Sequence, residues 1–204
     1  MSISTQNGPI ISPGRYRFAD WVVHNWSRAG LLVAVLLLAI APIIYQSSGR
    51  AVFLVFLWLP LYMLHQYEEH AQGKFLEFYQ RMMPRIAPLL TERKLLVVNL
   101  GMVWLLFVAA LYAAVYGWFW LALYVVYLAL INAIMHIGQF VAWRSYNPGL
   151  WTALVLFLPG AGYTLPAFAA LGATRSDNLI AFGLGVLAHG FLFALGRGWI
   201  AAQL

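Results

Sequence analysis

Six long apolar stretches occupy most of this sequence, and they constrain its fold more than any other feature. They cover about residues 29–45, 51–70, 95–116, 118–143, 150–171 and 179–198. Most approach the roughly 20 residues that a helix needs to cross a bilayer. Because 63% of the residues are hydrophobic and only 9% are charged, a soluble fold would lack the polar surface to cover itself. The sequence therefore predicts an all-α polytopic transmembrane helix bundle with about six spans.

The basic residues predict the orientation of this bundle. If the N-terminus is cytoplasmic, ten of the twelve Lys and Arg residues lie in cytoplasmic segments, and only Arg50 and Arg175 lie outside. This bias matches the positive-inside rule and places both termini in the cytoplasm. The net charge of +6 is thereby explained by topology, so we expect no nucleic-acid partner. No cleavable signal peptide precedes the first stretch, and we expect a multi-pass protein of a prokaryotic inner or plasma membrane.

The chain divides simply along its length. We expect residues 1–28 to form a cytoplasmic or interfacial segment and residues 29–204 to form a single transmembrane bundle domain. The one sizeable connection, residues 71–94, mixes aromatic residues and methionines with basic residues, which is typical of an interfacial segment. Cysteine is absent, which excludes disulfides, thiolate metal sites and a cysteine nucleophile.

Polar residues inside the apolar stretches are the candidates for function, because burying them in a membrane is costly. The second stretch ends with His65, Glu68 and Glu69, which share one face of a helix at positions i, i+3 and i+4. An imidazole and a carboxylate one turn apart can bind one metal ion or act as an acid/base pair. The fourth stretch carries Asn132 and His136, again one turn apart.

The three histidines of stretches two, four and six are predicted to lie at one depth. In each stretch the next basic residue on the cytoplasmic side follows the histidine by eight or nine positions. At 1.5 Å per residue, each imidazole lies roughly 12 Å above that residue. This predicts a shared site in the cytoplasmic half of the bilayer. We predict the metal ligands to be His65, Glu69, His136 and His189, and the catalytic residues to be Glu68, Glu69 and Asn132.

Structural roles remain open for the same residues. The two acids can mark the cytoplasmic end of a helix, Asn132 can bond to a neighbouring helix, and a buried histidine can bond to a carbonyl. The segment Tyr146-Asn147-Pro148-Gly149 forms a turn by its own chemistry and lies at the cytoplasmic mouth of the predicted site. Either Tyr146 or Asn147 assists the site, or the turn alone explains these residues.

The ordered set of motifs resembles the HXXEE-domain family of integral membrane proteins. The resemblance rests on His65-x-x-Glu68-Glu69, on Asn132-x-x-x-His136, on the turn from Tyr146 to Gly149 and on the late His189, and it covers nearly the whole chain. It implies an integral membrane protein with a metal or catalytic site at these positions. It implies no particular reaction.

We expect a membrane-embedded metal-dependent enzyme, with hydrolysis as the default reaction. Three imidazoles and one or two carboxylates favour a divalent ion, zinc first and iron or manganese as alternatives. The expected partners are the lipid bilayer and a lipid or other hydrophobic substrate near the cytoplasmic leaflet. Alternatives are metal-free acid catalysis by Glu68 or Glu69, as in a small membrane terpene cyclase, and an ion or proton transporter. The gathering of polar groups at one depth argues against transport.

Overall fold

The computed structural model describes residues 18–85 and 87–201, and over these residues the chain is helical without a strand. The predicted all-α fold class is confirmed. Most of the N-terminal segment predicted over residues 1–28 and the chain end at residues 202–204 lie outside the described residues. In chain order the elements are α1 Phe18–Ser47, α2 Arg50–His70, η1 Ala71–Gly73, α3 Lys74–Met82, η2 Ala87–Leu89, α4 Glu92–Val98, η3 Asn99–Trp104, α5 Leu105–Val115, α6 Phe119–Ala122, α7 Tyr124–Trp143, α8 Leu150–Thr152, η4 Ala153–Phe157, α9 Leu158–Ala170 and α10 Arg175–Ala201.

Five helical runs are long and apolar enough to cross a membrane. They are Phe18–Ser47, Glu92–Val115, Phe119–Trp143, Leu150–Ala170 and Arg175–Ala194. The sixth expected span is α2, which has the predicted bounds and 21 residues but is not one of these five. Its C-terminal end carries His65, Gln66, Glu68 and Glu69, which lower its mean hydropathy, and it packs against α1 and α5 within the bundle.

The ends of the helices follow from local chemistry. The first helix begins at Phe18, so the amphipathic segment from Trp21 to Arg28 extends the short first stretch. The helix α4 begins inside the predicted connection, because the Thr91 hydroxyl accepts a hydrogen bond from the Lys94 backbone N–H at 3.3 Å and caps it. Gly117, at φ +73°, makes the tight reversal between α5 and α6.

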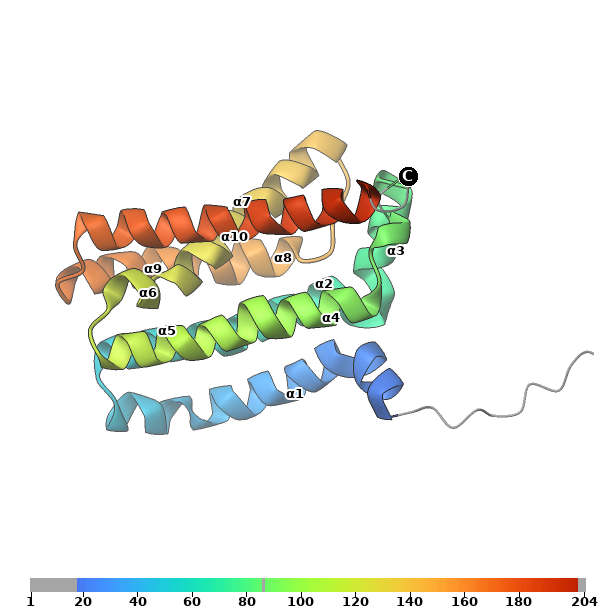
Figure 1. The fold of residues 1–204 in the computed structure, drawn as a ribbon. Coiled ribbons are helices and arrows are strands. Elements are labelled where there is room, and N and C mark those ends of the chain that lie inside the picture. Colours follow the sequence, from blue (N-terminus) through green and yellow to red (C-terminus); the bar gives the residue numbers. More distant parts are fainter. Residues whose placement is uncertain (1–17, 86, 202–204) are drawn as a thin grey trace, which may run out of the picture.

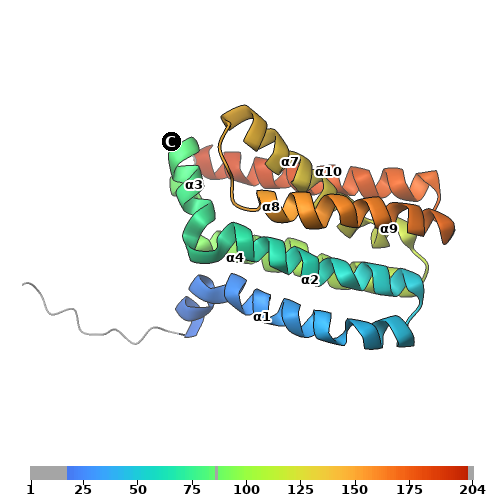
Figure 2. The same cartoon turned by 180° about the vertical axis from the view of Figure 1, so that it is seen from behind.

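The arrangement of the helices brings α2 and α7 together at one end of the bundle. Figure 1 shows that the axes of α1, α2 and the α4–α5 run are roughly parallel, and that α10 lies on the side of α4–α5 away from α1. The helix α7 crosses obliquely and contacts both α10 and α9, which the reverse view in Figure 2 also shows. The short helix α3 lies across the end of the bundle at which α1 begins and α10 ends. This common end is the one predicted to be cytoplasmic.

The outside of the bundle is apolar over most of its length. Large side chains such as Leu36, Leu105 and Leu187 are each more than 60% exposed. Contiguous apolar surface on this scale is unfavourable in water and is expected where a protein faces lipid. The buried aromatic residues Trp58, Phe157 and Phe168 fill the space between the helices. The polar side chains of α2 and α7 are therefore held inside an apolar shell.

Two π-helical segments adjoin the C-terminal half of α2. They are η3, Asn99–Trp104, and η4, Ala153–Phe157. The first is pinned by a closed set of buried hydrogen bonds: Gln66 Nε2 donates to Asn99 Oδ1 at 2.7 Å, and Trp104 Nε1 donates to Gln66 Oε1 at 2.8 Å. In the second, Phe157 packs its ring 4.5 Å from that of His65. Such π-helical turns are frequent at functional sites.

Candidate metal centre

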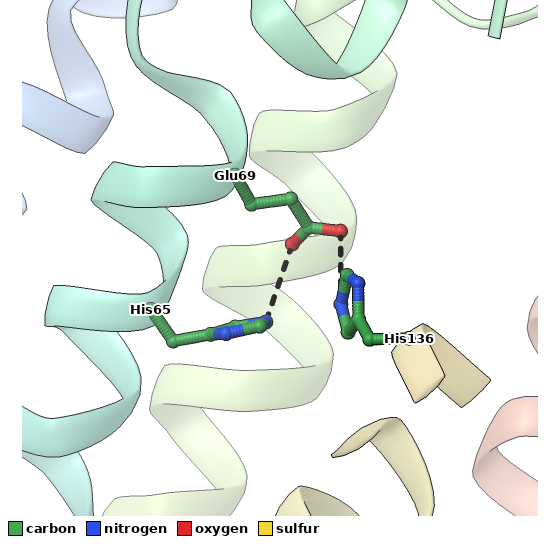
Figure 3. Close-up of side chains that lie close together, drawn as sticks. All are labelled: His65, Glu69 and His136. Atoms are coloured by element: carbon green, nitrogen blue, oxygen red, sulfur yellow. Dashed lines mark ion pairs between the residues drawn. The ribbon is translucent and has the colours of Figure 1, made fainter. Parts of the chain in front are cut away.

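His65, Glu69 and His136 meet near the end of the bundle at which α1 begins and α10 ends, which is the end predicted to be cytoplasmic. The helix α2 supplies His65 and Glu69 one turn apart, and α7 supplies His136, so that the Glu69 carboxylate lies between two imidazoles (Figure 3). Glu69 Oε2 lies 3.7 Å from His65 Nε2, and Glu69 Oε1 lies 3.8 Å from His136 Nε2. Ligand atoms of a tetrahedral zinc ion with bonds of about 2.1 Å are about 3.4 Å apart. The three side chains each offer one ligand atom, and these atoms lie within 4.8 Å of one another, so they could hold one metal ion if the side chains moved closer together.

The hydrogen bonds of Asn147 fix the tautomer of His136. Asn147 Nδ2 donates to the backbone carbonyl of His136 at 2.9 Å, which orients the amide unambiguously because a carbonyl only accepts. Asn147 Oδ1 then faces His136 Nδ1 at 2.5 Å and must accept a proton from it. His136 Nε2 is then the ring nitrogen that faces Glu69. Asn147 is 1% exposed, so no solvent competes for this pair.

Thr152 fixes the tautomer of His65 in the same way. Its hydroxyl donates to Glu68 Oε2 at 2.5 Å, and a carboxylate oxygen only accepts. The single hydroxyl proton is thereby used, so Thr152 Oγ1 accepts from His65 Nδ1–H at 2.8 Å. His65 Nε2 faces Glu69, and it is fully buried without a hydrogen-bond partner among the described residues.

Glu69 is held by its chain neighbour. His70 Nε2 donates to Glu69 Oε2 at 3.1 Å, while the His70 ring packs 5.0 Å from the ring of Trp26 on α1. Each of the three side chains thus makes a hydrogen bond with a neighbouring residue that orients it: His65 with Thr152, His136 with Asn147, and Glu69 with His70. Such orienting contacts are usual for metal ligands. The two Nε2 atoms and the Glu69 carboxylate thus face one common position, and a cation is a species that such a group can stabilise.

Gly149 closes the site from the side of the turn. Its φ is +98°, which disfavours a side chain, and a Cβ there would lie 2.7 Å from His136 Cε1 and 2.8 Å from His65 Cε1. The backbone of this residue therefore packs directly on both imidazole rings. The turn that the sequence predicts from Tyr146 to Gly149 therefore forms part of the site.

Glu68 points away from the three-residue group. Its carboxylate accepts from Tyr146 Oη at 2.7 Å, from the backbone N–H groups of Trp151 and Thr152, and from the Thr152 hydroxyl. It therefore caps the N-terminus of α8 from a distant part of the chain. Burial, and then the adjacent carboxylate, raises the pKa of Tyr146, which keeps its hydroxyl protonated and donating. The structure gives Glu68 bracing contacts and places it outside the His65–Glu69–His136 group.

A cavity of about 480 Å³ opens against this group, and its wall includes Glu69, His136, Asn132 and His189. Asn132 Oδ1 is buried without a hydrogen-bond partner in the described part of the chain. His189 is 8% exposed, and its Nδ1 donates to the Gly185 carbonyl at 2.8 Å. The structure thus brings the predicted Asn132 and His189 to the same cavity but leaves them outside the three-residue group.

Tyr79 on α3 is a candidate that the sequence analysis missed. It lines the cavity, and its oxygen accepts from Gln139 Nε2 at 3.1 Å, so its own proton is free to be donated. Burial raises the pKa of Tyr79 to about 12, which keeps the hydroxyl protonated at neutral pH. The sequence feature that could have indicated Tyr79 is the connection at residues 71–94, whose mixture of aromatic and basic residues follows directly after His65, Glu68 and Glu69.

Fold and site together define a helical bundle with membrane-crossing helices and a buried His₂–Glu group. The family model described as a protein of unknown function with an HXXEE motif matches residues 56–164, which is more than half of the chain. The chain belongs to this family, and the expected resemblance is confirmed. The matched residues include the turn at 146–149 and Thr152 but end before His189. No curated protein and no solved structure gives a significant match.

Proposed function

We propose that this protein is a membrane-embedded, metal-dependent hydrolase that binds zinc at His65, Glu69 and His136. The observation that carries the proposal is the convergence of two imidazoles and one carboxylate in a buried position. Because Thr152 and Asn147 accept the two Nδ1 protons, each ring turns its Nε2 toward this position. A divalent cation would be held by these two nitrogens and the carboxylate, and its binding would be coupled to the stability of the fold.

Three protein ligands favour a catalytic site over a structural one. Structural zinc sites usually have four protein ligands, whereas catalytic sites have three and leave a position for water. The His₂Glu set is one of the known catalytic combinations, and it borders the cavity here. A zinc ion at such a position lowers the pKa of bound water toward neutrality. Iron and manganese are compatible with the same nitrogen and oxygen ligands.

The residues of the cavity supply the remaining functions of a hydrolase. In the proposed reaction the oxygen of water forms a bond to the acyl carbon as water gives up a proton, the bond to the leaving group breaks, and the leaving group takes a proton from a donor that is re-protonated by the proton from water. We assign the proton donor to Tyr79, whose free proton faces this space. Asn132, one helical turn from His136, is positioned to orient the substrate. Glu68 and Thr152 hold His65 in place and do not contact the substrate.

A hydrophobic substrate is favoured by the setting of the site. Most of the cavity wall is apolar, with side chains from α3, η3, α7 and α10. A lipid in the cytoplasmic leaflet would reach the site without leaving the bilayer.

Elemental analysis of the purified protein tests the proposal. We expect one equivalent of a transition metal in the wild type, its loss in His136→Ala and Glu69→Gln, and its retention in His189→Ala. The last variant is the matched control, because it also removes a buried histidine that lines the same cavity. Metal that persists in His136→Ala, or a wild type that binds none when zinc, iron and manganese are each supplied, would refute the proposal. In the second case, activity that depends on Glu69 would instead indicate metal-free acid catalysis.

A further inference from the structure

The helix α3 covers the part of the cavity that lies beside Glu69. Its residues Phe75, Phe78 and Tyr79 line the cavity, and the ring of Phe75 packs 5.0 Å from that of His70, which follows Glu69 in the chain. Figure 1 shows α3 lying across the end of the bundle rather than along it. Its opposite face is exposed and polar, with Lys74, Glu77, Gln80 and Arg81. One short amphipathic helix therefore separates this part of the cavity from the outside.

The joint between α2 and α3 has a strained backbone. Gln72 has φ +63° and ψ +24°, and Gly73 has φ +75°, so two successive residues adopt the left-handed conformation. Glycine adopts this conformation without cost, whereas a residue with a side chain does not. Gln72 is exposed, and its side chain makes no hydrogen bond with the described residues that would offset the cost. Such strain persists only where the surrounding structure imposes it.

Few contacts hold α3 in this position. Its backbone packs mainly against α2, η1 and η2, which are its near neighbours along the chain. Two side chains join it to α7: Phe78, which is 1% exposed, packs its ring 5.4 Å from that of Trp143, and Tyr79 accepts a hydrogen bond from Gln139. Segments with few long-range contacts open at a free energy below that of global unfolding.

We infer that α3 is a lid, which swings about Gln72 and Gly73 to open the cavity beside Glu69 and closes when Phe78 and Tyr79 dock on α7. Docking of these two side chains offsets the strain at Gln72, and opening releases it. Hinges are typically a few residues at the end of an element that absorb the change in φ and ψ. The motion does not depend on the proposed hydrolase reaction. Only its consequence rests on that function, namely that the proton donor Tyr79 joins the site after a ligand is enclosed.

The reaction of a buried thiol with a water-soluble maleimide measures the opening of α3. The chain has no cysteine, so Phe78→Cys introduces the single reactive group, and the protein is kept free of metal. In this background Gly73→Ala should raise the labelling rate about 5- to 30-fold, because alanine disfavours the left-handed closed state but would meet no atom within 4 Å. Gln72→Gly should lower the rate by up to about fivefold, because it removes the strain but gains freedom in the open state.

Gly117→Ala and Arg144→Gly are the matched controls. Gly117 has φ +73° and also lacks neighbours within 4 Å, so its variant carries the same strain between α5 and α6, away from α3. Arg144 has φ +48°, and its substitution by glycine relieves strain as Gln72→Gly does, but at the end of α7. Both controls should leave the labelling rate nearly unchanged. A rate that does not respond to Gly73→Ala and Gln72→Gly, or that responds equally to the controls, overturns the inference.

A distance measurement keeps the test valid if Phe78→Cys itself weakens the docking of α3. Spin labels are attached through Gln80→Cys, on the exposed face of α3, and Ser176→Cys, exposed at the start of α10. The distance distribution should contain a longer component, from the open lid, that grows about 5- to 30-fold relative to the closed one in Gly73→Ala. A single, unchanged distance with and without Gly73→Ala would overturn the inference.

Discussion

Substitution of Gly149 by alanine tests whether the turn positions the two imidazoles. The new Cβ would lie 2.7 Å from His136 Cε1, 2.8 Å from His65 Cε1 and 2.9 Å from His136 Nε2, whereas carbon atoms pack best at about 3.5–4.0 Å. One or both rings must therefore move by up to about 1 Å. The left-handed backbone adds about 1–2 kcal/mol of strain. We expect metal affinity to fall about 10- to 100-fold, as when the partner that orients a ligand is lost.

Gly172→Ala is the matched control for this prediction. Gly172 has φ +99°, almost that of Gly149, but a Cβ there would meet nothing within 4 Å. Both variants therefore carry the backbone strain, and only Gly149→Ala also displaces the imidazoles. Thermal unfolding should show a comparable loss of stability in the metal-free forms, and metal titration should separate the two variants. Equal metal affinity in both would refute the view that Gly149 holds the two rings.

Three further predictions concern the groups around the site. Asn147→Ala should lower metal affinity about 10- to 100-fold by releasing the His136 tautomer, and Asn147→Asp, which keeps the acceptor, should recover part of it in the same titration. Thr152→Val should cost about 1–3 kcal/mol in chemical unfolding, because it leaves His65 Nδ1 unpaired, and Thr152→Ser should restore most of the loss. Tyr79→Phe should reduce kcat roughly a hundredfold to ten-thousandfold with little change in metal content. Because burial raises the pKa of Tyr79 to about 12, its proton-donating form persists at neutral pH and is lost only as the pH rises through about 12, so wild-type kcat should show no alkaline limb near 10.

The fold could be predicted from the sequence because hydrophobic periodicity and helix length are local properties. The last helix was placed four residues short at its N-terminus, where Arg175 and Asp177 begin α10. The first was placed eleven residues short, since its amphipathic start at Phe18 does not look like a span. In both cases helix continues into polar sequence at the membrane boundary, where hydropathy no longer reports secondary structure.

The candidate site could be predicted only in part from the sequence, for a different reason. The spacing of His65 and Glu69 on one helix is set by the helical repeat, and their convergence follows from sequence alone. Depth was also calculable, and it grouped His65, His136 and His189. Depth does not give the distance between helices, however, and the structure places only the first two within reach of Glu69. The contributions of Asn147 and Gly149 depend on the path of a turn, which composition identified but could not place.

The adjacency of Glu68 and Glu69 has a geometric explanation in this structure. Successive residues of a helix point about 100° apart, so two neighbouring carboxylates one turn after His65 cannot serve the same site. Glu69 faces His65 and His136, whereas Glu68 faces α8 and receives four hydrogen bonds from its neighbourhood. One of those donors is the Thr152 hydroxyl, whose oxygen in turn accepts from His65. The HXXEE string thus contains two candidate metal ligands, His65 and Glu69. Its other glutamate, Glu68, binds the Thr152 hydroxyl, and Thr152 in turn orients His65.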